Sequence, residues 1–157
     1  MKEISVEIQI DIPENSKSLV HEIQNAVSKT IEVVSPALTD LSLSLLICDD
    51  SVMKMLNNAY RGIDQPTDVL SFPADYTLPE SHTTYLGDIA ISYPTAHKQA
   101  TLGNYPVNQE IMLLTVHGVL HLLGYDHLSD NDKKVMWDFQ NKILTLLGYK
   151  DFPLPDE

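Results

Sequence analysis

A chain of 157 residues is long enough to form one domain that buries its own core, and 43 % hydrophobic with 20 % charged residues is typical of a globular protein. The 22 acidic and 10 basic residues give a formal net charge of -12, which argues against tight, sequence-independent binding to long nucleic acid. No stretch is apolar for long enough to span a bilayer or to act as a signal peptide, and the single cysteine, Cys48, excludes an internal disulfide. We therefore expect a single domain over residues 1–157, located in the cytoplasm and without a membrane partner.

The first third of the chain predicts a strand, a helix and a second strand. Apolar residues alternate from Ile4 to Ile10, which is typical of a half-buried strand. Ser16 can cap a helix whose apolar positions keep helical spacing until Pro36 forbids its continuation. Alternating leucine and isoleucine over residues 41–47 predict the second strand.

A second helix follows, and an arginine ends it. The run Asp49–Ser51 offers an N-cap, and Gly62 is suited to close the helix in a left-handed conformation. Arg61 therefore lies at the C-terminal end of this helix.

The rest of the chain predicts two more strands and three more helices. In order, these are a strand at 68–72, a polar loop at 74–84, a strand at 86–92, and helices at 95–102, 106–123 and 129–146. Because helices and strands are intermixed without a repeat, we expect an α+β fold. In this fold a small mixed sheet of about four strands packs against about five helices.

Three histidines are clustered near the end of the fourth predicted helix. Residues four apart in a helix differ by about 40° around its axis, so His117 and His121 project from one face and can reach a single ion. His127 would point away from that face if the helix continued. Gly124 can end the helix with a positive φ and turn the chain back, so that His127 joins the other two. We expect a zincin-like metal-binding helix.

Three neutral imidazoles favour a catalytic zinc site. A structural zinc normally has four protein ligands, whereas a catalytic one leaves a position for water. Zinc lowers the pKa of such a water to about 7, which supplies hydroxide at neutral pH and indicates hydrolysis. A structural ion closed by Asp126 or Cys48 is the alternative interpretation.

The same HxxxHxxGxxH spacing occurs in the metzincin proteases, which carry a glutamate directly after the first histidine. In this chain that position is Gly118. The carboxylate that moves protons in peptide hydrolysis is therefore missing, which weakens a protease or amide hydrolase as the second interpretation.

Beyond the histidine motif, the chain resembles the YbeY family of bacterial endoribonucleases, which act in ribosomal RNA maturation. The resemblance spans most of the chain and depends on four segments. These are Leu56-Asn57-x-x-Tyr60-Arg61-Gly62, Pro66-Thr67-Asp68-Val69-Leu70-Ser71-Phe72-Pro73, Leu86-Gly87-Asp88-Ile89 and the stretch from His117 to His127.

The resemblance implies one zinc ion on His117, His121 and His127, and a functional arginine at Arg61. It also implies cleavage of RNA, in particular maturation of the 3′ end of the small-subunit ribosomal RNA and ribosome quality control. Small-subunit ribosomal proteins or assembly factors are the implied protein partners. A non-catalytic ribosome-assembly module with structural zinc is the third interpretation.

The chemistry of two side chains, Arg61 and Glu110, indicates what they could do. The planar, permanently charged guanidinium of Arg61 matches phosphoryl oxygens, so we expect it to balance charge on the phosphate during cleavage. Glu110 lies two helical turns before His117, where its carboxylate could orient a ligand imidazole.

Overall fold

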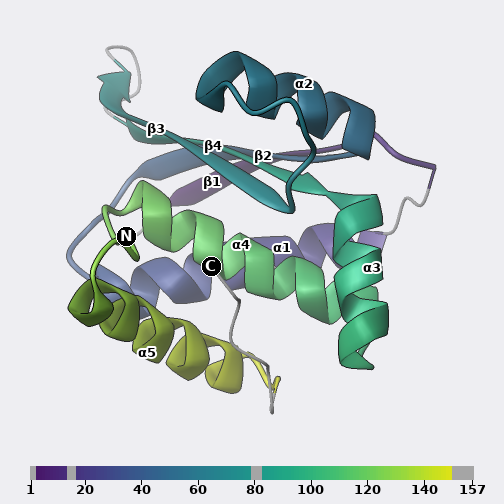
Figure 1. Ribbon diagram of the computed structural model, residues 1–157. Helices are drawn as coiled ribbons and strands as arrows, with labels where there is room; N and C mark the ends of the chain where they lie inside the picture. The colour runs from purple at the N-terminus through teal and green to yellow at the C-terminus, as the bar shows by residue number, and fades with distance from the viewer. Residues whose placement is uncertain (1–2, 14–16, 79–82, 150–157) are drawn as a thin grey trace.

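The structure is a computed structural model that describes residues 3–13, 17–78 and 83–149. Within these ranges it contains four strands and five helices (Figure 1). In chain order they are β1 (Ile4–Ile10), α1 (Lys17–Val34), β2 (Leu41–Cys48), α2 (Asp50–Arg61), β3 (Val69–Leu78), β4 (Thr83–Ser92), α3 (Tyr93–Gly103), α4 (Val107–Leu122) and α5 (Asp130–Leu146). The predicted α+β class, with a small mixed sheet and five helices, is confirmed.

The four strands form one sheet in the order β1-β2-β4-β3. The strands β1, β2 and β4 are mutually parallel, and β3 pairs antiparallel with β4 at one edge. Along β2, every second residue from Leu41 to Ile47 is buried, which follows from the alternation of side chains between the two faces of a strand.

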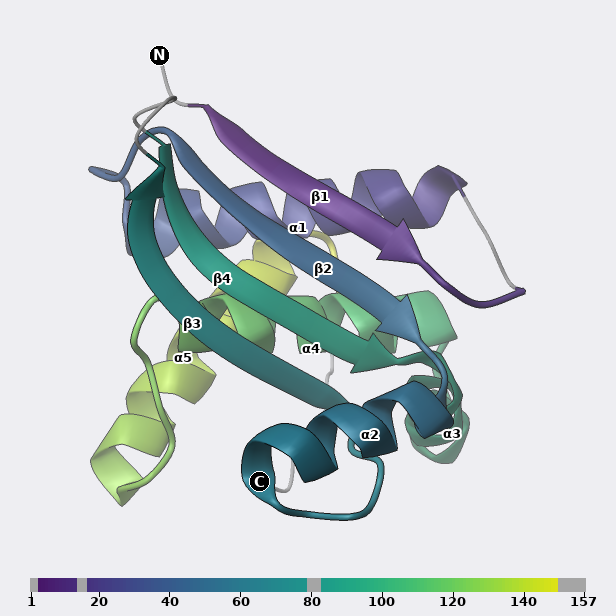
Figure 2. The ribbon, with the colours of Figure 1, turned by 90° about the horizontal axis from the view of Figure 1, so that it is seen from above.

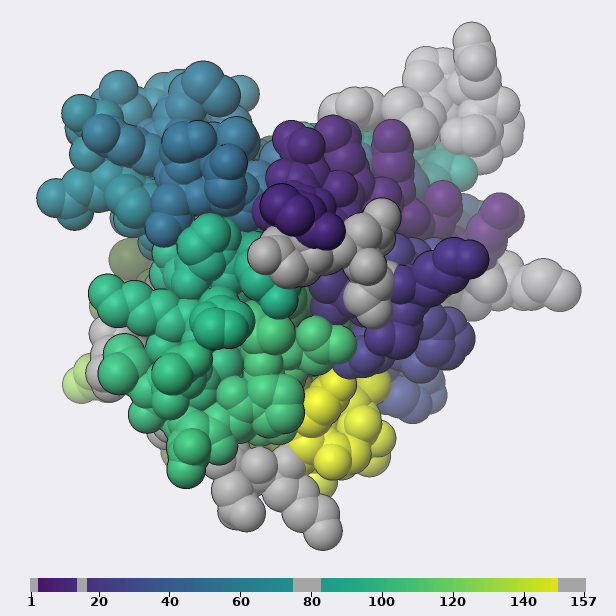
Figure 3. Space-filling view, turned by 90° about the vertical axis from the view of Figure 1, so that its right-hand side faces the viewer, coloured from purple at the N-terminus to yellow at the C-terminus, as the bar shows by residue number. Residues whose placement is uncertain are grey.

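The helices divide unequally between the two faces of the sheet. The helices α1 and α4 lie against one face and α5 packs on these two helices, whereas α2 lies over the other face near the carboxyl ends of β2 and β4 (Figures 1 and 2). Figure 3 views the molecule from the side of α3, where α2, α3 and β1 all reach the surface. Much of the second face of the sheet is therefore not covered by a helix.

Helix α4 is the centre of the core. It contacts α1, α3, α5 and the sheet, and nearly all its residues from Glu110 to Leu122 are buried. The sequence of α4 is apolar on every side, as expected for a helix that is surrounded by other elements. This burial holds the two helical histidines on a rigid support. No helix in the described part of the chain combines the length and the apolar character that crossing a membrane requires.

The predicted loop at 74–84 is wrong at both ends. Strand β3 continues to Leu78 and β4 already begins at Thr83; residues 79–82 lie outside the described ranges. Pro73 is tolerated inside a strand because β3 is an edge strand and its pairing with β4 is irregular between Pro73 and Tyr76. The polar sequence suggested a loop, but an edge strand needs few buried side chains.

The helix ends depend on the capping residues. Asp49 accepts a hydrogen bond from the backbone N–H of Val52 at 2.9 Å, and Gly62 closes α2 with a φ of 71°. Ser92 caps α3, which therefore begins two residues before the predicted Thr95. The predicted cap at Ser16 falls outside the described residues.

Candidate metal centre

The structure brings the three motif histidines together. His117 and His121 lie one turn apart on α4, and their Nε2 atoms are 3.0 Å from each other. Gly124 has a φ of 100°, and the chain turns there so that the backbone N–H of Tyr125 donates to Leu120 at 3.0 Å. His127 then faces the pair, and one ring nitrogen from each histidine lies within 4.8 Å of the others.

This arrangement fits a single zinc ion. Two nitrogens that are each bonded to tetrahedral zinc at 2.0–2.1 Å lie about 3.3 Å apart, close to the separation between His117 and His121. No fourth His, Cys, Asp or Glu side chain of the described residues joins the cluster. Three histidine nitrogens would hold the ion, and a set of three protein ligands is typical of catalytic rather than structural zinc sites.

Gln140 of α5 orients the first of these histidines. Its Oε1 accepts a hydrogen bond from Nδ1 of His117 at 3.0 Å, and both side chains are almost fully buried, at 1 % and 3 % exposure. A proton held on Nδ1 leaves the lone pair on Nε2, which is the atom that faces the other two histidines.

Sequence reasoning missed Gln140 and suggested Glu110 for this role. Glu110 is buried, but its carboxylate accepts a hydrogen bond from the hydroxyl of Tyr105, and burial raises its pKa. Gln140 did carry a signal, because it lies four residues after Met136 and three before Ile143, on the apolar side of α5. A polar side chain in such a stripe needs a buried partner.

The histidine cluster lies in surroundings that favour neutral imidazoles. Burial, together with the neighbouring His117 and His127, lowers the pKa of His121 to about 4. The indole ring of Trp137 lies against both His117 and His127, with ring centroids 5.6 and 5.7 Å away. A neutral imidazole keeps the lone pair that a metal ion requires.

The cluster opens into a cleft with a volume of about 640 Å³. Its walls come from the start of β3, including Val69, Ser71 and Pro73, and from the turn that carries His127. Arg61, the last residue of α2, also lines this cleft and is exposed. The structure therefore brings Arg61 into the same cleft as the three histidines, although it lies 56 positions before the first of them in the sequence.

Gly118 occupies the position of the metzincin glutamate, and it faces the sheet. A Cβ atom at this position would lie 3.0 Å from Cγ2 of Ile89 and 3.3 Å from Oγ of Ser71. The Ser71 hydroxyl donates to the backbone carbonyl of Gly118 at 3.3 Å. A larger side chain would have to displace Ile89, so the close packing of α4 on the sheet explains the glycine.

Cys48 is not part of the cluster. It is fully buried at the end of β2, in a separate group with Met53, Leu70 and Ala90. Burial, and secondarily the nearby Asp49, raises the pKa of its thiol to about 11. The metal-binding form of cysteine is the thiolate, so Cys48 is unsuited to close the site.

The chain is similar to proteins of one known family. The family described as "Endoribonuclease YbeY" matches residues 3–148. A protein of Persephonella marina named "Endoribonuclease YbeY" is 43 % identical over 122 residues, which cover 77 % of this chain and 78 % of the relative. A protein of Desulforamulus reducens with the same name is 42 % identical over 144 residues, which cover 89 % of this chain and 92 % of the relative.

The fold is also similar to that of a protein whose structure has been solved. The solution structure of TM1509 from Thermotoga maritima superimposes with a TM-score of 0.62 at 26 % identity, covering 90 % of this chain and 88 % of that one. The matched range includes Arg61, Gln140 and the whole histidine motif. The chain belongs to the YbeY endoribonuclease family.

Proposed function

We propose that this chain is a zinc-dependent endoribonuclease of the cytoplasm that acts on ribosomal RNA, with His117, His121 and His127 as zinc ligands and Arg61 as the phosphate-binding residue. The observation that carries the proposal is the open three-histidine cluster in a cleft that Arg61 also lines. Family membership supports the RNA substrate. The resemblance of the sequence motifs further supports maturation of the small-subunit RNA 3′ end, ribosome quality control, and small-subunit proteins or assembly factors as partners.

Each side chain has a distinct task in this proposal. A zinc ion, when bound, would acidify a water molecule and so supply a nucleophile near neutral pH. Gln140 holds the proton of His117 on Nδ1 and so keeps Nε2 available as a ligand. Arg61 offers a fixed fork of N–H donors to the phosphoryl oxygens, where negative charge increases during cleavage.

The geometry disfavours the two rival functions. In an amide hydrolase of the metzincin type a glutamate would follow the first histidine, but this chain has Gly118 there, where a Cβ atom alone would already lie only 3.0 Å from Cγ2 of Ile89. A structural zinc would need a fourth protein ligand, and the described residues place none beside the three histidines.

Two variants test the proposal. His121→Ala is expected to lose the metal and RNA cleavage together, whereas Arg61→Ala should keep the metal and lose about 10²–10³-fold in turnover. Lys54→Ala is the matched control, because Lys54 is another cation of α2 and does not line the cleft. Metal content is measured on the purified protein, and cleavage is measured on a structured RNA and on casein. RNA cleavage by metal-free His121→Ala, or casein hydrolysis by the unaltered chain, would contradict the proposal.

A further inference from the structure

The free edge of β3 forms one wall of the metal cleft. Strand β3 is the last strand of the sheet, and in the described part of the chain it pairs with β4 alone. Residues 69–71 and 73 of this strand line the cleft together with the turn that carries His127. Figure 2 shows the chain after α4 passing outside β3 on its way to α5. The function proposed above assigns no role to this edge.

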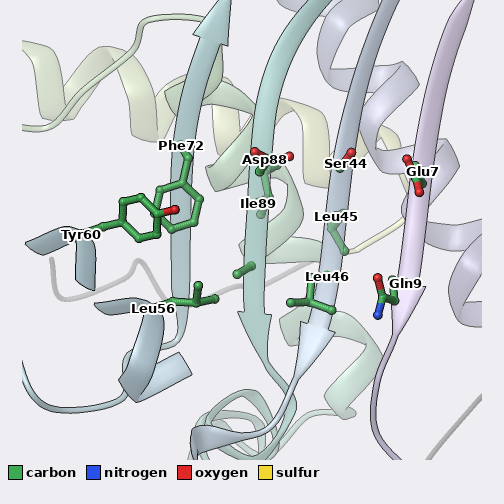
Figure 4. Close-up of a pocket in the computed structure, with 11 residues that line it drawn as sticks. Glu7, Gln9, Ser44, Leu45, Leu46, Leu56, Tyr60, Phe72, Asp88 and Ile89 are labelled. Carbon is green, nitrogen blue, oxygen red and sulfur yellow. The ribbon is translucent and has the colours of Figure 1, made fainter. Parts of the chain in front are cut away.

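The cleft reaches residues on both faces of β3, which places it at the edge of the strand. Neighbouring side chains in a strand point to opposite faces. The Ser71 hydroxyl donates to the backbone carbonyl of Gly118 in α4, whereas Phe72 lies on the face turned away from α4 (Figure 4). Leu70 shares the face of Phe72, yet it lines the cleft together with Ser71. The backbone of β3 between these residues is therefore part of the cleft wall.

The strand register shows which backbone groups point to the free edge. In an antiparallel pair, residues that exchange backbone hydrogen bonds with the partner strand alternate with residues whose N–H and C=O point away from it. The N–H of Ser92 in β4 donates to the carbonyl of Asp68 at 2.9 Å, so the even-numbered residues at the start of β3 bond to β4. Val69, Ser71 and Pro73 therefore direct their backbone groups to the free edge.

This edge is poor in hydrogen-bond donors. Pro73 has no N–H, and the N–H of Val69 donates to the carboxylate of Asp68 at 2.7 Å. Of the three outward-facing residues, only Ser71 keeps an N–H for a ligand, next to the outward carbonyl of Val69. An extended peptide would need a continuous row of donors and acceptors, so the edge is unsuited to strand addition. The Ser71 N–H and the Val69 carbonyl instead suit one group that both accepts and donates a hydrogen bond.

We propose that this pair of backbone groups binds a ribose 2′-hydroxyl of the RNA substrate and thereby distinguishes RNA from DNA. The N–H of Ser71 donates to the hydroxyl oxygen, and the hydroxyl donates to the carbonyl of Val69. A 2′-hydroxyl is both donor and acceptor, and it is the group that DNA lacks. Arg61, the proposed phosphate-binding residue, lines the same cleft, so phosphate and sugar are bound by different groups. The inference rests on the endoribonuclease function proposed above.

The test measures binding of three fluorescein-labelled heptamers to the zinc-loaded full chain. They consist of uridine, 2′-deoxyuridine or 2′-deoxy-2′-fluorouridine, so they share bases and phosphates and differ only in the 2′ group. The fluoro probe keeps the sugar pucker of RNA but has no hydroxyl to donate. Stopped-flow anisotropy reads binding before the RNA is cleaved. The unaltered chain is expected to bind the uridine probe about tenfold more tightly than the other two, because only this probe forms both hydrogen bonds.

Two variants of Ser71 test the role of its N–H. Ser71→Pro removes this donor and is expected to reduce the preference for uridine to about threefold or less, whereas Ser71→Ala retains the donor and the preference. Pro73 shows that this edge tolerates proline, because the N–H lost there would not bond to β4. If Ser71→Pro fails to fold, a backbone ester with glyceric acid in place of Ser71 removes the same N–H. The zinc content of each variant is expected to equal that of the unaltered chain.

The outcomes separate this inference from the function on which it rests. If the three probes bind equally, or if the preference survives the loss of the N–H, the sugar subsite is refuted, and RNA cleavage that depends on Arg61 leaves the endoribonuclease function intact. If Ser71→Pro loses the preference only together with zinc, the effect belongs to the metal centre and the proposal is overturned. If light scattering shows that Ser71→Pro converts a dimer into a monomer that binds all probes as before, the edge pairs with a second chain and the proposal is likewise overturned. If the unaltered chain neither binds the uridine probe nor cleaves RNA, the proposed function itself fails.

Discussion

The hydrogen bond from His117 to Gln140 allows a quantitative test of the metal centre. In Gln140→Leu the side chain keeps a similar size but has no acceptor. The imidazole of His117 can then carry its proton on Nε2, the atom that faces the other two histidines. We therefore expect weaker metal binding, although all three ligands are still present.

The size of the effect follows from the burial of both side chains. Gln140 and His117 are almost inaccessible to water, so the loss of this buried hydrogen bond costs about 1–3 kcal/mol. Loss of a partner of this kind typically lowers metal affinity by about 10- to 100-fold, equivalent to about 1.4–2.8 kcal/mol. The two energy ranges agree, so we expect the Kd for zinc to rise by about 10- to 100-fold.

The assay is competition for zinc against a chromophoric chelator at constant pH. Gln140→Glu retains an acceptor and is expected to restore most of the affinity. Asn141→Leu introduces the same side chain at the neighbouring exposed position and should leave the Kd unchanged. A Kd for Gln140→Leu within twofold of the unaltered chain would refute the argument that the orientation of His117 controls metal binding.

Three further predictions concern stability and reactivity. Zinc at a hundred times its Kd should raise the free energy of unfolding by about 2.7 kcal/mol, seen as a higher Tm, and an equal shift in His121→Ala would contradict the assigned ligands. Gly118→Glu should lower the free energy of unfolding in urea by about 3 kcal/mol, because its side chain meets Ile89, and should not hydrolyse casein; a stable, proteolytic variant would reverse our reading of this position. Burial, then Asp49, raises the pKa of Cys48 from 9.0 to about 11, so iodoacetamide should label the native thiol far more slowly than the urea-unfolded one, and equal rates would show that the thiol is accessible. Because the unfolded thiol ionises first, stability should fall as the pH rises from about 9 to about 11.

The elements that carry strong local signals could be predicted from the sequence. Alternation in β1 and β2 and the caps of α2 and α5 depend on residues that are neighbours in the chain, and the structure agrees with them. The loop predicted at 74–84 was wrong because the pairing of β3 with β4 is set by backbone hydrogen bonds to a partner strand, which a polar sequence does not reveal.

In the candidate site, too, local spacing could be predicted from the sequence, whereas contacts between distant elements could not. The four-residue spacing of His117 and His121, with the turn at Gly124, determines by helical geometry alone that two imidazoles share a face and that a third can return to them. Family motifs in the sequence pointed to Arg61, but only the packing of α2 beside β3 shows that it lines the same cleft.

Only the tertiary structure decided which side chain supports the histidine cluster. Gln140 reaches His117 because α5 packs against α4. The physical reason is that contacts between distant segments depend on the relative positions of whole elements. Local spacing determines which face of an element a side chain occupies, and packing determines what it meets there.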